Sequence, residues 1–230
     1  MDTISLQTGK PIDIYLPNIY RYMNKEYVDL FFNEGKLRLS SFRKFHEYPD
    51  EIRGDKNEGK GGITGLGNSG FQFHVMSDVG KEAYILCGSL LESEEIKKNF
   101  ECDSCFRIVR PIEFSVAISN SLAGFGRSFQ GFCNYRSTRI LKKAIEGLDI
   151  KDFTGPEGTI IIGGQKGNQR INDILGSGID LMFLKEDNYQ SQSEYRFIWT
   201  INTKFYAVHE YIDIECKEAI QFCERVDGTQ

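Results

Sequence analysis

Hydrophobic and polar residues alternate with a period of two along several short segments, the pattern typical of β-strands. The clearest case is the segment 194–201, which follows a short polar stretch. Its aromatic side chains fall on one face of the predicted strand, and its charged side chains fall on the other. The first face holds Tyr195, Phe197 and Trp199, and the second holds Glu194, Arg196 and Ile198.

A strand–helix–strand unit is predicted near the start of the chain. Residues 19–23 form a short strand pattern, and Asn24 is a favourable N-cap for a helix over residues 25–33. Gly35 ends that helix, because glycine readily adopts the left-handed conformation found at helix C-termini. Residues 37–42 then alternate as a second strand.

The remaining pattern predicts one α+β domain over residues 1–230, with mixed or antiparallel sheets and peripheral helices. Residues 1–18 are expected to be an irregular lead-in, and the polar, glycine-rich segment 47–70 a surface loop. An amphipathic helix is expected at residues 138–147 and a strand at residues 181–184.

Composition narrows the classes of partner. The 230 residues carry a formal net charge of −5, which argues against a broad nucleic-acid-binding surface. The first six residues lack the basic and apolar regions of a signal peptide, and no apolar run reaches the roughly 18 residues needed to span a bilayer. We therefore expect a cytoplasmic protein with no membrane partner.

Familiar metal and nucleophile motifs are incomplete. Cys102-x-x-Cys105 is a lone pair, whereas a structural zinc site needs two further ligands at matching spacing. No Gly-x-Ser-x-Gly element or other nucleophile signature accompanies the three histidines. We expect no metal, and we expect the six cysteines to be free thiols.

Three groups of polar residues remain as a candidate site. Arg21 lies on the first predicted strand, Ser40-Ser41 end the second, and Gln192-x-Glu194 opens the late aromatic strand. This order resembles that of ADP-ribosyltransferases of the arginine–serine–glutamate type. The resemblance implies an ADP-ribosyltransferase-like fold and NAD as the substrate.

The resemblance also implies roles for individual residues. Arg21 would hold a phosphate of NAD, Ser40 and Ser41 would shape the nicotinamide pocket, and Gln192 would orient the acceptor or the ribose. Glu194 would stabilise the oxocarbenium-like transition state as nicotinamide leaves, since a carboxylate suits a site of developing positive charge. The aromatic residues that would stack on nicotinamide are Tyr22, Phe42 and Tyr48.

Short blocks at both ends of the chain are also similar to an uncharacterised bacterial domain family. That family has a Tyr-Lys-Tyr-like strand, a Leu-x-Leu-Ser block leading to Phe-Asn-Asp-Pro, and a final Glu-Tyr-Arg block. The corresponding segments here are 20–22, 37–45 and 194–196, although Phe45-His46-Glu47 stands where Phe-Asn-Asp is expected.

Two functions of different classes follow. The first is an NAD-dependent ADP-ribosyltransferase or NAD-cleaving enzyme, such as a bacterial toxin or anti-phage effector, acting on a macromolecular acceptor. The second is a non-catalytic module that recognises a protein partner or a nucleotide signal, with the segment 47–70 as its contact surface. The simplest interpretation of Glu194 itself is a strand-end carboxylate paired with Arg196 or Lys185.

Overall fold

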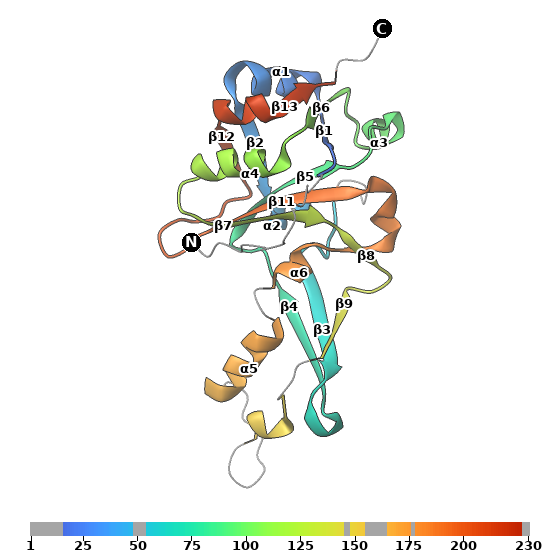
Figure 1. Cartoon of the computed structure of the whole chain (residues 1–230), viewed down its shortest axis with the longest axis vertical. Coiled ribbons are helices and arrows are strands. Elements are labelled where there is room, and N and C mark those ends of the chain that lie inside the picture. The colour runs from blue at the N-terminus through green and yellow to red at the C-terminus, as the bar shows by residue number, and fades with distance from the viewer. Residues whose placement is uncertain (1–15, 48–53, 145–147, 155–164, 176–177, 227–230) are drawn as a thin grey trace, which may run out of the picture.

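The aromatic strand predicted at residues 194–201 is β11 (Glu194–Ile201), and it lies within an eight-stranded antiparallel sheet (Figure 1). The computed structural model describes residues 16–47, 54–144, 148–154, 165–175 and 178–226. The other strands of this sheet are β1 (Ile19–Met23), β2 (Lys36–Ser41), β5 (Ala83–Ser89), β6 (Ser104–Ile108), β7 (Phe125–Phe132), β12 (Tyr211–Glu215) and β13 (Cys223–Arg225). We call this sheet and the helices around it the upper lobe.

The predicted strand–helix–strand unit is confirmed as β1, α1 (Lys25–Glu34) and β2. Val28 and Phe31 are buried three residues apart on one face of α1, as an amphipathic helix requires. Gly35 ends the helix with a φ of 75°, and its N–H donates to the carbonyl of Phe31. A Cβ atom at Gly35 would lie 2.6 Å from the backbone nitrogen of Lys217, so both the conformation and the close approach require glycine.

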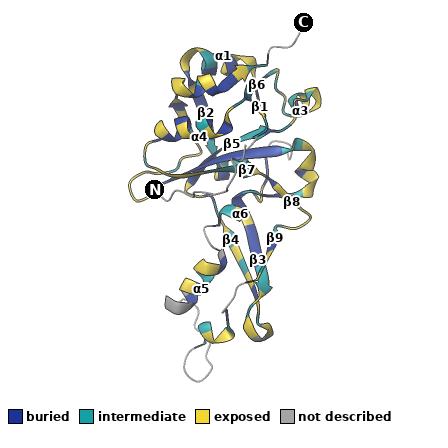
Figure 2. Ribbon diagram, viewed as in Figure 1, coloured by how far each residue is buried: buried dark blue, intermediate teal, exposed yellow. Residues whose placement is uncertain are grey.

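One face of the large sheet carries the main hydrophobic core. The aromatic face of β11 packs there against α1, against α4 (Pro111–Asn120) and against a 3-10 helix, Lys217–Phe222. The opposite face of β11 is also buried, and Ile198 packs there with Phe42 of α2 (Phe42–Phe45) and Met182 of α6 (Ile179–Met182). Figure 2 shows β11 buried along its length. The predicted alternation is therefore confirmed, with both faces covered.

The lower lobe is built on a three-stranded sheet. In it β3 (Lys60–Leu66) pairs antiparallel with β4 (Gln72–Asp78) and parallel with β9 (Ile140–Ala144), beside α5 (Gln165–Leu175) (Figure 1). Two short parallel strands, β8 (Asn134–Arg136) and β10 (Leu184–Glu186), lie between this sheet and the upper lobe. The remaining helices in the described residues are α3 (Glu94–Asn99) and the 3-10 segments Asn68–Gly70, Ile150–Asp152 and Asp187–Gln192.

Three sequence predictions are wrong in the lower lobe. Residues 60–66 of the expected glycine-rich loop form β3, where a Cβ on Gly65 would overlap the carbonyl oxygen of Lys143 in β9. Its glycines thus allow strands to approach closely. The helix expected at 138–147 is strand β9 over its described part, because short apolar runs fit either period and pairing with β3 decides. The strand expected at 181–184 begins only at Leu184, in β10, because Leu181 and Met182 belong to the helical turn α6. This turn directs Leu181 and Met182 into two different hydrophobic clusters.

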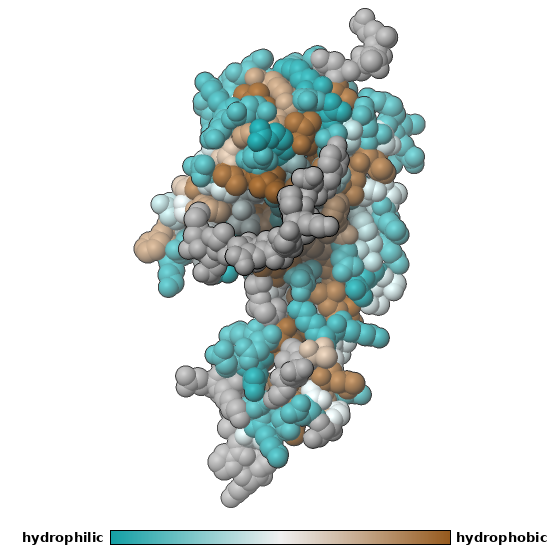
Figure 3. All heavy atoms as spheres, viewed as in Figure 1, coloured by the Kyte–Doolittle hydropathy of each residue, from teal (hydrophilic) through white to brown (hydrophobic). Residues whose placement is uncertain are grey.

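The chain is a single α+β domain with mostly antiparallel sheets and helices at the periphery, as the pattern predicted. The expected lead-in at 1–18 lies outside the described residues except for 16–18. On the face seen in Figure 3, hydrophobic side chains form separate patches among hydrophilic ones.

Candidate functional site

The candidate site lies where the large sheet forks. β5 pairs with β11 along one edge from Ala83 to Ser89. On its other edge β5 pairs with β2 only at Tyr84 and Ile85, and with β1 only at Ser89. β1 and β2 therefore diverge beside residues 86–88, and the gap between them opens into a pocket of about 370 Å³.

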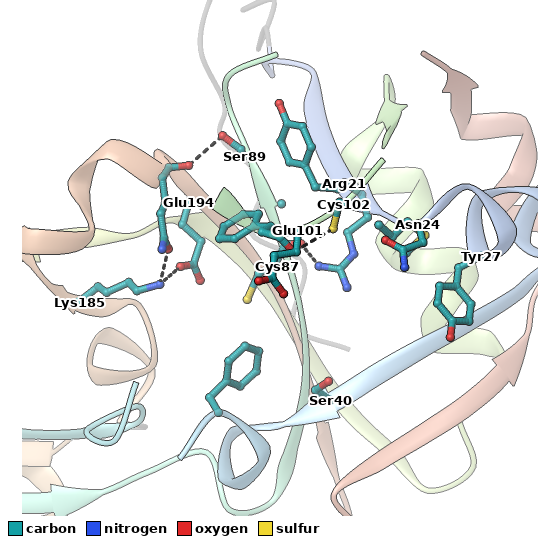
Figure 4. Close-up of a pocket in the computed structure, with 16 residues that line it drawn as sticks. Arg21, Asn24, Tyr27, Ser40, Cys87, Ser89, Glu101, Cys102, Lys185 and Glu194 are labelled. Carbon is teal, nitrogen blue, oxygen red and sulfur yellow. Dashed lines mark hydrogen bonds and ion pairs between the residues drawn. The ribbon is translucent and has the colours of Figure 1, made fainter. Parts of the chain in front are cut away.

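Five of the residues predicted from sequence line this pocket. They come from β1, from β2, and from the end of the 3-10 helix Asp187–Gln192 together with the start of β11. These segments are far apart along the chain but meet at the fork (Figure 4). They are Arg21, Tyr22, Ser40, Gln192 and Glu194.

Of the other three predicted residues, the two that the structure describes do not line the pocket. Ser41 is buried on the opposite side of β2 from Ser40, and its hydroxyl has no hydrogen-bond partner among the described residues. Phe42 begins α2 and packs with Ile85 and Ile198. Tyr48 lies outside the described residues.

Arg21 closes the fork from the side of β1. One terminal guanidinium nitrogen, Nη1, donates to the carbonyl oxygen of Cys87 at 2.7 Å, on the edge of β5 that neither β1 nor β2 covers (Figure 4). The Nε of Arg21 is buried and has no hydrogen-bond partner among the described residues. A fixed guanidinium that lines a pocket can bind a phosphate or carboxylate through its remaining donors.

Glu194 belongs to a buried chain of four alternating charges. One carboxylate oxygen accepts from Arg196 Nε at 2.6 Å, and the other accepts from Lys185 Nζ. Arg196 in turn donates from both terminal nitrogens to the carboxylate of Glu58, at 2.8 and 2.9 Å. Arg196 is 0%, Glu58 2%, Glu194 5% and Lys185 6% exposed. The simplest interpretation of Glu194, a carboxylate paired with Arg196 or Lys185, is thus confirmed, with both partners present.

These charges fix the ionisation of Glu194. Burial by itself raises the pKa of the Glu194 carboxyl, but the opposite charges and hydrogen bonds of Arg196 and Lys185 outweigh burial and hold the pKa well below its usual range. Burial likewise lowers the pKa of Lys185, and the charge of Glu194 more than reverses this and raises it. Glu194 is therefore a carboxylate across the neutral range.

The turn before β11 places Gln192 beside Glu194. The side-chain oxygen of Gln192 accepts from Lys185 Nζ at 2.9 Å, and its backbone oxygen accepts from the Ser89 hydroxyl at 2.8 Å. Between them Ser193 adopts a left-handed conformation with a φ of 43°. Such backbone strain in a non-glycine residue is common at functional sites.

Eleven other described lining residues were not predicted as part of a pocket, among them Asn24, Tyr27, Glu101 and Lys185. Lys185 was predicted only as an ion-pair partner, Asn24 only as a helix cap, and Tyr27 only as part of the helix over residues 25–33. Glu101 had no predicted role. The i, i+3 spacing of Asn24 and Tyr27 on a helix following Arg21 is a signal that was present in the sequence. Lys185 reaches the pocket from the short strand β10 and Glu101 from the turn after α3, and no local pattern of the sequence predicts either position.

Burial keeps two thiols in and near the pocket protonated. Burial raises the pKa of Cys87, which lines the pocket beside Glu194, well above its usual value. Burial also raises the pKa of Cys105 to about 11. Within the described residues none of the six cysteines is part of a disulfide. No group of three or more His, Cys, Asp or Glu side chains in this part of the chain is placed to hold a metal ion.

No helix in the described part of the chain is long and apolar enough to cross a membrane. In comparisons with known proteins, no family model, no curated protein and no solved structure matches this chain.

Proposed function

We propose that the pocket at the sheet fork binds NAD and that the protein cleaves the bond between nicotinamide and ribose. The ADP-ribose passes to a macromolecular acceptor or to water. The observation that carries the proposal is the convergence of Arg21, Ser40, Gln192 and Glu194 on one pocket. Such a pocket, concave and lined by aromatic side chains with a few polar groups, is typical of small-molecule sites.

The reaction needs a carboxylate and an anion anchor. As nicotinamide leaves with the electrons of the C–N bond, positive charge develops on the ribose, and the attacking nucleophile later gives up its proton. Glu194 is a carboxylate fixed in a water-poor environment, where a charge acts more strongly than in bulk water. Arg21 anchors the diphosphate, and the aromatic ring of Tyr22 borders the nicotinamide. Ser40 is opposite Ile85, whereas Glu194 is opposite Ser89 and Arg21 contacts Cys87 between them, so Ser40 lines the pocket on the far side of Arg21 from Glu194.

The test is release of nicotinamide from NAD by the purified protein and by Glu194→Gln. We expect the rate of nicotinamide release to be at least about 100-fold lower in the variant than in wild type. This is the scale of one electrostatic contact to a transition state. Glu194→Gln alone leaves two buried cations, Lys185 and Arg196, with a single carboxylate, Glu58. This unbalanced buried charge lowers the stability of the folded protein.

A double variant separates catalysis from folding. Glu194→Gln with Lys185→Met restores a neutral buried chain, because only the Glu58–Arg196 pair remains charged. We expect the double variant to be folded and still inactive. Recovery of nicotinamide release in the double variant would mean that Glu194 has only a structural role.

A second function is favoured by one specific observation. Both oxygens of Glu194 already accept hydrogen bonds from cations, which suits a pocket that binds a nucleotide without cleaving it. This function predicts NAD binding in a calorimetric titration with no release of nicotinamide, in the presence or absence of an acceptor extract.

A further inference from the structure

The end of the pocket beyond Arg21 is formed by two residues at the start of α1. Asn24 and Tyr27 both line the pocket there, and Figure 4 places them in order after Arg21, away from Glu194. Tyr27 is a large aromatic residue that is 53% exposed. An exposed aromatic ring at a pocket mouth is a surface on which a planar ring can stack.

Asn24 departs from the role that its position predicts. It is the N-cap of α1 with extended backbone angles, yet its side chain makes no capping hydrogen bond. The backbone N–H of Lys25 instead donates to the Asp103 carboxylate at 2.6 Å. Because the Asn24 side chain does not cap the helix, its amide can offer both an N–H donor and a carbonyl acceptor to a ligand in the pocket.

These two side chains together have the chemistry that recognises adenine. Residues three apart on a helix share a face, so the amide of Asn24 and the ring of Tyr27 meet the same end of the pocket. An asparagine amide can pair with the N6 and N7 atoms of adenine, and an aromatic ring can stack on the base.

We propose that the Asn24–Tyr27 end binds the adenine ring, so that the pocket selects an adenine dinucleotide over the nicotinamide mononucleotide. This inference rests on the proposed function for its orientation. In Figure 4 Glu194 lies at one end, Arg21 lies between, and Asn24 and Tyr27 lie at the other. Gln192 shares Lys185 Nζ with Glu194 and so belongs to the Glu194 end. That order matches nicotinamide ribose, diphosphate and adenosine along NAD.

The experiment is calorimetric titration of NAD, ADP-ribose and nicotinamide mononucleotide into wild type, Tyr27→Ala and Tyr27→Phe. We expect Tyr27→Ala to lower the affinity for NAD and for ADP-ribose by at least about fivefold. This is the low end of the effect of losing one base–aromatic stack. Affinity for the mononucleotide should not change, because it has no adenine. Tyr27→Phe keeps the ring and should bind all three like wild type.

A second variant tests the amide. Asn24→Ser keeps a residue favoured at the N-cap, so α1 should remain stable. Wild type should prefer NAD over its hypoxanthine analogue by about 5- to 100-fold, and Asn24→Ser should lose that preference.

The outcomes separate this inference from the proposed reaction. The adenine subsite would be overturned if wild type failed to bind ADP-ribose. It would also be overturned if Tyr27→Ala lowered the affinity for the mononucleotide as much as the affinity for NAD. ADP-ribose binding that depends on Tyr27, without any nicotinamide release, would support the adenine subsite and refute the cleavage reaction.

Discussion

Replacing Arg196 by methionine should test the buried charge chain most directly. Arg196 is fully buried and is the only residue that joins Glu58 to Glu194 in the described structure. Its removal leaves two buried carboxylates with Lys185 as the remaining cation. Breaking a buried ion pair by deleting one partner costs about 3–5 kcal/mol. For a chain of this size that corresponds to a fall in melting temperature of about 6–20 °C.

The chain provides its own probe for the measurement. Trp199 is the single tryptophan, is fully buried in β11, and donates its indole N–H to the carbonyl of Ser115 at 3.2 Å. Its fluorescence should shift to longer wavelength on unfolding in urea. A cycle of Arg196→Met, Glu58→Gln and the double variant then isolates the coupling between the two residues.

The double variant carries the sharper expectation. With Glu58 and Arg196 both neutral, only the Lys185–Glu194 pair remains charged, so the double variant should be more stable than Arg196→Met alone. Coupling of roughly 1–3 kcal/mol is expected for groups in contact. An Arg196→Met protein within about 0.5 kcal/mol of wild type, the ordinary range for surface substitutions, would refute the account of a stabilising buried network.

Three further predictions concern the backbone and pH. Gly65→Ala should lower the free energy of unfolding by about 1–3 kcal/mol, because its Cβ would overlap the β9 backbone. The matched control is Gly131→Ala, whose Cβ would lie 3.7 Å from the nearest atom, on the ring of Phe183. Urea titration measures both variants. Ser193→Gly should raise the melting temperature by about 2–4 °C through relief of about 1 kcal/mol of strain, and an unchanged value in calorimetry would count against strain there. Because the folded pKa of Glu194 is depressed, its contribution to stability is present above about pH 4.3 and is lost as pH falls through the folded value. As pH is lowered, the free energy of unfolding should therefore fall more steeply for wild type than for Glu194→Gln. Parallel plots of this free energy against pH for the two proteins would contradict the prediction.

The parts of the fold that could be predicted from sequence are those with a strong local pattern. β1, α1, β2 and β11 each carry their own periodicity, and Gly35 marks the end of α1 through its backbone conformation. Three of these elements supply Arg21, Ser40 and Glu194. The expectation that these three residues share a site came from the resemblance to ADP-ribosyltransferases and not from the periodicity of the elements.

The remainder depends on tertiary pairing that no local pattern records. β3 and β9 have weak patterns of their own and are strands because each lies against the other. Glu58 sits in a polar segment that looked solvated, yet it is buried because Arg196 reaches it across the two lobes. The fork itself arises because β1 and β2 pair with different ends of β5, which only the assembled sheet reveals.

The ion pairs of Glu194 and a role in the pocket are compatible on hydrogen-bonding grounds. A carboxylate has about four lone-pair sites, and the described contacts from Arg196 and Lys185 use one on each oxygen. The remaining sites can accept from the hydroxyl groups of a ribose. The two cations hold the carboxylate in one orientation and keep it ionised, which is the preorganisation that an electrostatic site needs. Because Arg196 is itself held by Glu58, the orientation of Glu194 depends on a residue of the segment that leads into β3 in the lower lobe. Glu58→Gln should therefore make the orientation of the Glu194 carboxylate less fixed, because it weakens the hold on Arg196. It does so without changing any side chain that lines the pocket.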